Sequence, residues 1–143
     1  MPYEVKEKPE LWAIGMTWKG SDSKEIPQLW DRFVPVMHDY RSPGFPEQAF
    51  GICRNWDEAT KTFEYMAAVE GSSMADVPEG MEKWQIPAAT YAVFDATLPT
   101  IHDDMGAACQ EVQPVGPIIE LYDENFNPPE GKMNLKIYIP INP

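Results

Sequence analysis

The sequence predicts an α+β fold in which two strand–helix–strand–strand units form antiparallel sheets with the helices on one side. The first observation is that fifteen prolines and nine glycines divide the chain into short elements. The second is that two segments with helical spacing of apolar residues are each preceded by one apolar run and followed by two more. The third is the length of 143 residues, which suits a single domain at 1–143, with halves at about 1–72 and 80–143.

The first half is expected to hold a strand, a helix and two further strands, at 11–18, 26–40, 50–56 and 62–71. Apolar residues in the helical segment recur every three or four positions, so they share one face. Pro27 suits the first turn, where its missing N–H costs no hydrogen bond. Pro35 lies in the interior of the segment, and we expect it to kink the helix because it cannot donate to the preceding turn.

The second half repeats this order after a polar linker, with a strand at 90–97, a short helix after Thr100, and strands at 118–123 and 134–141. Thr100 can cap the helix, and Asp103 and Asp104 place negative charge in its first turn, where the helix dipole favours it. The residues of the two halves are not obviously alike. The predicted duplication therefore rests on the order and spacing of the elements.

The charge balance is strongly acidic, with 23 acidic and 11 basic residues and a net charge of −12. A surface of this sign repels phosphate backbones, so we expect no DNA binding by this chain alone; it favours cations and basic partners. Cys53 and Cys109 are too few for a disulfide framework, and we expect free thiols in a reducing, cytoplasmic compartment. No apolar run is long enough for a membrane span, and we expect no metal site and no cofactor.

Glu120 is a carboxylate in an otherwise apolar segment that is typical of a strand. It faces either water or a group that attracts negative charge. Aromatic residues make up 12% of the chain, and aromatic faces beside a carboxylate suit an organic cation. Strand alternation puts Tyr122 on the face of Glu120 and turns Ile119 and Leu121 the other way, which we expect to be the face covered by the helices. The residues alone leave a solvated Glu120 and a ligand pocket both open.

Three apolar residues of the last strand are interpreted as core: Leu135, Ile137 and Ile139. Alternation then leaves Tyr138 for the side of Glu120. Trp30 and Phe33 lie on the apolar face of the first helix and are also interpreted as core.

Four stretches of the chain resemble the GyrI-like (gyrase-inhibitor-like) small-molecule-binding domains: 26–33, 62–70, 78–94, and 118–122 together with 137–141. Such domains occur as effector-binding domains of AraC- and MerR-type regulators that respond to many drugs, and as free-standing proteins. The resemblance implies the duplicated fold with a ligand cleft between its halves. It also implies that a buried carboxylate near the C-terminus, here Glu120, meets cationic aromatic ligands. Tyr65 and Trp84 then join Tyr122 and Tyr138 as expected aromatic walls.

The chain also departs from this family pattern. The stretch 94–120 is short and lacks the longer helix, the Trp-containing loop and the Ser-Gly pair of many relatives, so we expect one rim of the pocket to be more open or rebuilt. No DNA-reading segment precedes the domain in this sequence.

Three functions follow from these patterns. The first is binding of cationic, aromatic or apolar small molecules at Glu120 without chemistry. The second is hydrolysis of electrophilic toxins with Glu120 as the general base for water, because a raised carboxyl pKa serves both roles. The third is an acidic protein that binds a protein partner, such as gyrase. The sequence does not indicate an oligomeric state.

Overall fold

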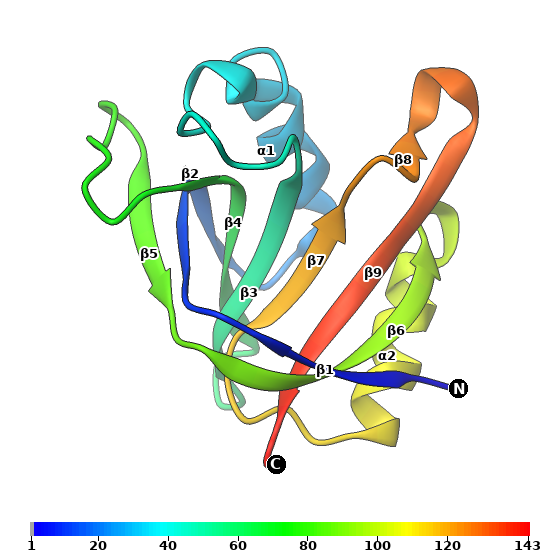
Figure 1. Cartoon of the computed structure of the whole chain (residues 1–143). Helices are drawn as coiled ribbons and strands as arrows, with labels where there is room; N and C mark the ends of the chain where they lie inside the picture. Colours follow the sequence, from blue (N-terminus) through cyan, green and yellow to red (C-terminus); the bar gives the residue numbers. More distant parts are fainter. Residues whose placement is uncertain (1) are drawn as a thin grey trace.

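The computed structural model describes residues 2–143 (Figure 1). The strands in this part of the chain are β1 (Glu4–Lys8), β2 (Leu11–Gly20), β3 (Ala49–Asp57), β4 (Thr62–Gly71), β5 (Glu82–Ile86), β6 (Ala89–Thr97), β7 (Ile118–Tyr122), β8 (Phe126–Asn127) and β9 (Lys132–Ile141). The α-helices are α1 (Ile26–Phe33) and α2 (Ile101–Glu111). The 3-10 turns are η1 (Ser23–Glu25), η2 (Met37–Asp39), η3 (Leu98–Thr100) and η4 (Pro128–Glu130).

The strands form one antiparallel sheet in the order β1-β6-β9-β7-β3-β4-β2-β5, and β8 pairs with the start of β9. The predicted α+β class is confirmed, with one continuous sheet in place of separate ones. The sheet is continuous because β3 and β7 pair at its centre, with Gly51 opposite Glu120.

The two edge strands are exchanged between the two parts of the chain. β1 precedes β2 in sequence but pairs with β6, and β5 precedes β6 but pairs with β2. Each edge strand therefore ties one part of the sheet to the other. β1 and β5 were not among the elements expected from the apolar runs. The side chains of β1 are mostly charged and exposed, because an edge strand needs no buried face.

The prediction of a helix continuing to residue 40 is wrong, because α1 ends at Phe33. The last helical hydrogen bond runs from the Val34 N–H to the Trp30 carbonyl. Pro35 has no N–H to extend the ladder, and its ring crowds the carbonyl one turn earlier, so it ends the helix and does not merely kink it. Pro27 lies in the first turn, as predicted.

Both α-helices pack on the same face of the sheet. α1 covers a core that includes Tyr65 and Val69, and α2 covers a core that includes Phe94 and Ile137. The cross-strand pair Glu120–Ile137 joins the two regions on one face. In residues 2–143, no helix is long and apolar enough to cross a membrane.

The opposite, helix-free face has its own buried core, which contains Ile119, Leu121 and Tyr138. The prediction that Ile119 and Leu121 face the helices is therefore wrong. These side chains are buried because the sheet coils and because β1 and the β5–β6 connection cross this face (Figure 1).

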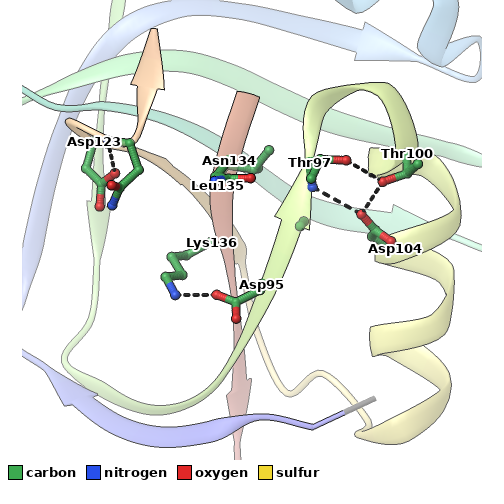
Figure 2. Close-up of a pocket in the computed structure, with 10 residues that line it drawn as sticks. Asp95, Thr97, Thr100, Asp104, Asp123, Asn134, Leu135 and Lys136 are labelled. Carbon is green, nitrogen blue, oxygen red and sulfur yellow. Dashed lines mark hydrogen bonds and ion pairs between the residues drawn. The ribbon is translucent and has the colours of Figure 1, made fainter. Parts of the chain in front are cut away.

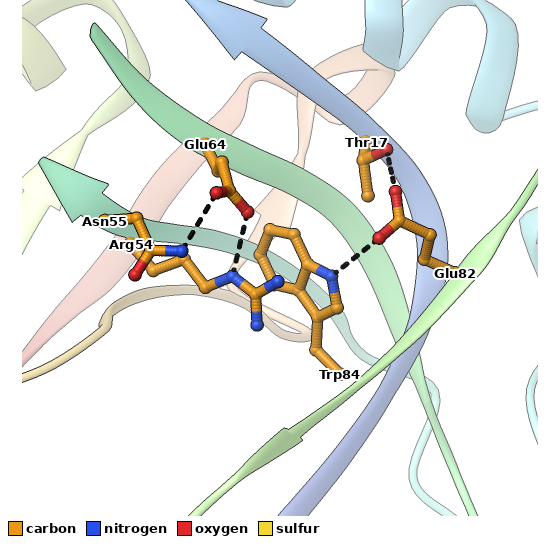
Figure 3. A network of polar contacts seen from close by, with 6 residues as sticks. All are labelled: Thr17, Arg54, Asn55, Glu64, Glu82 and Trp84. Atoms are coloured by element: carbon orange, nitrogen blue, oxygen red, sulfur yellow. Dashed lines mark hydrogen bonds and ion pairs between the residues drawn. The ribbon is translucent and has the colours of Figure 1, made fainter.

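The coiling is visible where Arg54 of β3 stacks on Trp84 of β5, with the guanidinium carbon 3.5 Å from the ring centroid, although two strands separate β3 from β5 in the sheet (Figure 3). Arg54 also pairs with Glu64 at 3.1 Å, and the Trp84 indole donates to Glu82. The cation–π contact joins β3 to β5 across the curl, and the ion pair with Glu64 of the neighbouring β4 orients the guanidinium for it.

Candidate functional site

A cavity of about 1250 Å³ opens on the helix-bearing face, above the central strands β3 and β7. α1 and the segment that follows it form one wall, and η3 with the start of α2 forms another. Segment 123–129, which contains β8, completes the rim. Since β3 and β7 are the strands at which the two parts of the sheet meet, the cavity lies over their junction.

Glu120 lies on the floor of this cavity and is the one buried charged residue among residues 2–143, with 7% of its surface exposed. The Tyr65 hydroxyl donates to Glu120 Oε1 at 2.7 Å and the Tyr122 hydroxyl donates to the same oxygen at 2.9 Å. The Trp30 indole N–H donates to the Tyr65 hydroxyl at 2.9 Å. Within the described residues no donor bonds Oε2, so that oxygen is available to a ligand.

The glycine at position 51 makes room for this carboxylate. A Cβ atom there would lie 2.1 Å from the Tyr65 hydroxyl and 2.2 Å from Glu120 Oε1. Any side chain would therefore displace the Tyr65–Glu120 hydrogen bond. Glycine opposite Glu120 therefore leaves the space that the Tyr65 hydroxyl and the Glu120 carboxylate occupy.

The electrostatics of the site follow from burial. Desolvation raises the pKa of Glu120 above its ordinary value, and the hydrogen bonds from Tyr65 and Tyr122 partly offset this increase. Burial, together with the Glu120 charge, raises the pKa of both tyrosines well above their usual range, so they remain donors. Burial and the same charge also raise the pKa of the Cys53 thiol on the cavity wall, which makes it a poor nucleophile.

Aromatic rings stand around the carboxylate. The Tyr122 ring is 5.4 Å from the Trp30 ring and 4.7 Å from the Phe126 ring, both in edge-to-face geometry. Trp30 comes from α1, Tyr122 from the end of β7 and Phe126 from β8. This arrangement combines aromatic surface with a partly desolvated negative charge, which is the chemistry that recognises organic cations.

The rest of the lining is also acidic. Five carboxylates line the cavity: Asp31, Glu47, Glu120, Asp123 and Glu124. Arg41 is the arginine among the lining residues, and its guanidinium pairs with Glu47 at 3.5 Å. The local potential therefore favours a cation over an anion.

The α2 wall is held in place by a small hydrogen-bonded group at the helix start, beside a polar hollow of about 480 Å³ (Figure 2). Asp104 accepts from the Thr97 backbone N–H at 3.2 Å and from the Thr100 hydroxyl at 2.7 Å. Thr100 precedes the helix as predicted, although its hydroxyl bonds the Asp104 side chain and not the backbone.

The structure brings Glu120, Tyr65 and Tyr122 of the expected site together and leaves two residues elsewhere. Tyr138 pairs with Ile119 and lies in the core of the helix-free face, so the prediction that it shares the face of Glu120 is wrong. Trp84 lies in the same core, stacked under Arg54. Both faces of β9 are buried over residues 137–140, and alternation in such a stretch does not show which face holds the ligand pocket.

Sequence reasoning missed two walls of the cavity. Trp30 was interpreted as core; it is half-buried, and its indole faces the Glu120 network. Phe126 lies in a two-residue strand within a polar, Pro-rich segment, which carries no periodicity. The one available signal for Trp30 was its place at the edge of the apolar face of the helix.

A cavity between two helices over an antiparallel sheet, with a carboxylate in its floor, defines an effector-binding domain. The chain belongs to the Cass2 family of integron-associated effector binding proteins, whose family model matches residues 4–141. The resemblance to gyrase-inhibitor-like domains is thereby confirmed.

Individual relatives agree with this assignment. The transcriptional regulator BrlR of Pseudomonas aeruginosa is 34% identical over 152 residues, which cover 99% of this chain and 56% of the regulator. The chain thus spans about half the length of this curated relative.

Two solved structures share the fold. The structure of SAV2435 bound to tetraphenylphosphonium superposes with a TM-score of 0.80 at 19% identity, covering 99% of this chain and 94% of that one. The integron cassette protein VCH_CASS2 from the mobile metagenome of Vibrio cholerae superposes with a TM-score of 0.67 at 16% identity, covering 98% and 95%.

Proposed function

We propose that this chain binds aromatic organic cations, with the cationic centre at Glu120 Oε2 and the rings against Trp30, Tyr122 and Phe126. The observation that carries the proposal is the buried Glu120 carboxylate, which lines a large cavity and has both of its hydrogen bonds on one oxygen. The Tyr65 hydroxyl fixes the orientation of that oxygen and leaves the other free.

The preference for a cation follows from desolvation. A carboxylate that is buried without a charged partner costs several kcal/mol relative to water. Two hydroxyl donors offset part of this cost, and the raised pKa of Glu120 shows that a part remains. A ligand cation supplies the missing charge, whereas a neutral ligand of the same shape does not.

We further propose that the domain consists of two equivalent halves with the ligand site between them. One ligand-binding domain spans the chain, its halves at about 1–72 and 80–143 repeat the strand–helix–strand–strand order, and the ligand occupies the cleft between them. The reciprocal pairing of β1 with β6 and β5 with β2 supports two equivalent halves. The relative solved with tetraphenylphosphonium, itself a lipophilic cation with aromatic rings, supports the ligand class.

The experiment is a thermal-shift titration with tetraphenylphosphonium and the neutral triphenylphosphine oxide, because a ligand that binds only the native state raises the melting temperature. Three proteins are compared: wild type, Glu120→Gln and Glu79→Gln. Glu79 is exposed and lies outside the cavity. Its replacement by glutamine changes the formal net charge by the same amount as Glu120→Gln.

The proposal predicts stabilisation of wild type and Glu79→Gln by the cation alone, and little or none for Glu120→Gln. Equal stabilisation by the cation and the neutral compound, or equal response of the two variants, would show that Glu120 does not select charge.

A second candidate is hydrolysis of an electrophilic ligand, with Glu120 as the general base. The observation that favours it is the raised pKa of the Glu120 carboxyl, which brings its basicity closer to that needed at neutral pH. Its test is turnover: consumption of a compound in molar excess over protein, abolished in Glu120→Gln. Binding without consumption supports the first function alone.

A further inference from the structure

We propose that the cavity has a second, apolar subsite along α2, formed by Leu98, Ile101 and Met105, which takes a flexible hydrocarbon arm of the bound cation. The ligand class is then an amphiphilic organic cation, with an aromatic group, a positive centre and an alkyl arm. This inference rests on the proposed binding of cations at Glu120 and names the part of the ligand that Glu120 does not contact.

The apolar face of α2 divides into two sections with different surroundings. In the second half of the helix, Ala108 is fully buried against the sheet. In the first half, Ile101 and Met105 pack against that core with part of their surface, and both line the cavity. Leu98, in the 3-10 turn just before the helix, also lines the cavity and is 39% exposed. The apolar face of α2 therefore lines the cavity at the start of the helix and is part of the core in its second half.

This apolar wall is continuous with the carboxylate site through Tyr122. Tyr122, Ile101 and Met105 all pack against the buried cluster under α2 and all line the cavity, and the Tyr122 hydroxyl donates to Glu120 at 2.9 Å. Tyr122 therefore connects Glu120 to the α2 wall, and a ligand with its cationic centre at Glu120 can extend along Tyr122 to that wall.

The two walls differ in chemistry. On the α1 side, the Trp30 indole is fixed by its hydrogen bond to the Tyr65 hydroxyl, which favours a flat ring at a defined place. On the α2 side, Leu98, Ile101 and Met105 present apolar surface and Met105 is flexible, while His102 is the one polar residue of this wall in the described part of the chain. A wall of this kind gains by covering apolar area and requires no particular shape, which suits an alkyl chain.

The volume leaves room for such an arm. Pockets that enclose a drug-sized ligand span roughly 300–1,000 Å³. The cavity here is about 1250 Å³, so an aromatic head at Glu120 does not fill it. The contacts of Asp104 with Thr97 and Thr100 hold the α2 start, so the wall exists before the ligand arrives (Figure 2).

The experiment measures affinity across a series of benzyl-dimethyl-alkylammonium ions from methyl to octyl, by isothermal titration calorimetry on the full chain. The head group is constant and only the arm grows. The variants are Met105→Gln and Leu98→Ser, which make the wall polar at a half-buried and an exposed position. Met74→Gln is the matched control, since Met74 is 88% exposed and does not line the cavity.

Wild type and Met74→Gln are expected to gain affinity with each methylene, by up to about fourfold per group. In Met105→Gln and Leu98→Ser this gain falls, while the Kd of the methyl compound stays within about twofold of wild type. A purely structural effect would weaken all members of the series equally and would overturn the inference, as would an unchanged slope in both variants.

Different results would refute the cation site at Glu120 and the apolar subsite along α2. If Glu120→Gln binds the methyl compound as tightly as wild type, the Glu120 site itself is refuted. If Glu120→Gln loses that binding but the alkyl slope does not depend on the α2 residues, only the α2 subsite is refuted.

Discussion

Replacing Gly51 with alanine tests how the sheet builds the carboxylate site. The new Cβ would lie 2.1 Å from the Tyr65 hydroxyl and 2.2 Å from Glu120 Oε1, whereas ordinary contact begins at 3.4 Å. Each oxygen would therefore have to withdraw by more than about 1 Å, which breaks their 2.7 Å hydrogen bond. Overpacking costs about 1–3 kcal/mol and a lost hydrogen bond to a charged group about 1.5–3 kcal/mol, so we expect a loss of roughly 2.5–6 kcal/mol in unfolding free energy.

The assay is urea denaturation followed by circular dichroism, with Gly106→Ala as the control. Gly106 lies inside α2, and a Cβ there would meet no atom within 4 Å. Its replacement removes the helix penalty of glycine and should stabilise the protein by up to about 1 kcal/mol. Gly51→Ala should also weaken binding of tetraphenylphosphonium at least about tenfold, a change of 1.4 kcal/mol. A Gly51→Ala protein as stable as wild type, with unchanged cation affinity, would refute this account of the site.

Three further predictions concern charge and placement. Burial raises the folded-state pKa of Glu120 above 4.5, so its stabilising contribution is full below pH 4.5 and is lost as pH rises through the folded-state pKa. Urea denaturation should therefore show Glu120→Gln gaining stability relative to wild type between pH 4 and pH 8; a constant difference would contradict the burial of the charge. The Tyr65 hydrogen bond lowers the pKa of Glu120, so in Tyr65→Phe the pH below which cation affinity is lost should move upward; calorimetry across pH would show a downward or absent shift if this were wrong. Trp84→Phe should reduce stability but leave the cation Kd within about twofold, because Trp84 is in the core of the helix-free face; a tenfold weaker Kd would return Trp84 to the site.

Much of the fold was predictable because most strands are bounded by prolines, glycines or polar turns and have at least one buried face. β4 has the bounds that its sequence predicts, and β3, β6 and β7 differ from theirs by one residue at one or both ends. β1 was not predictable in this way, because the charged run Glu4–Lys8 becomes a strand only through its pairing with β6. Tertiary pairing overrides local propensity at such an edge.

The site was predictable only in part for a related reason. Alternation places Tyr122 with Glu120 correctly, since both lie on one short strand. It fails for Tyr138 because the strand β9 is buried on both sides, by α2 on one and by the coiled sheet on the other. For Trp30, the place at the edge of the apolar face of α1 is a weak signal, and assigning it to the cavity also requires the position of α1 above the sheet, which the helix pattern does not give.

The most direct test of the central claim is the calorimetric comparison of tetraphenylphosphonium with triphenylphosphine oxide on wild type and Glu120→Gln at pH 7.5. The account predicts that wild type binds the cation at least about tenfold more tightly than the neutral compound, and that this ratio collapses toward one in the variant. A ratio that survives in Glu120→Gln would place cation selection elsewhere in the cavity and contradict the role assigned to Glu120.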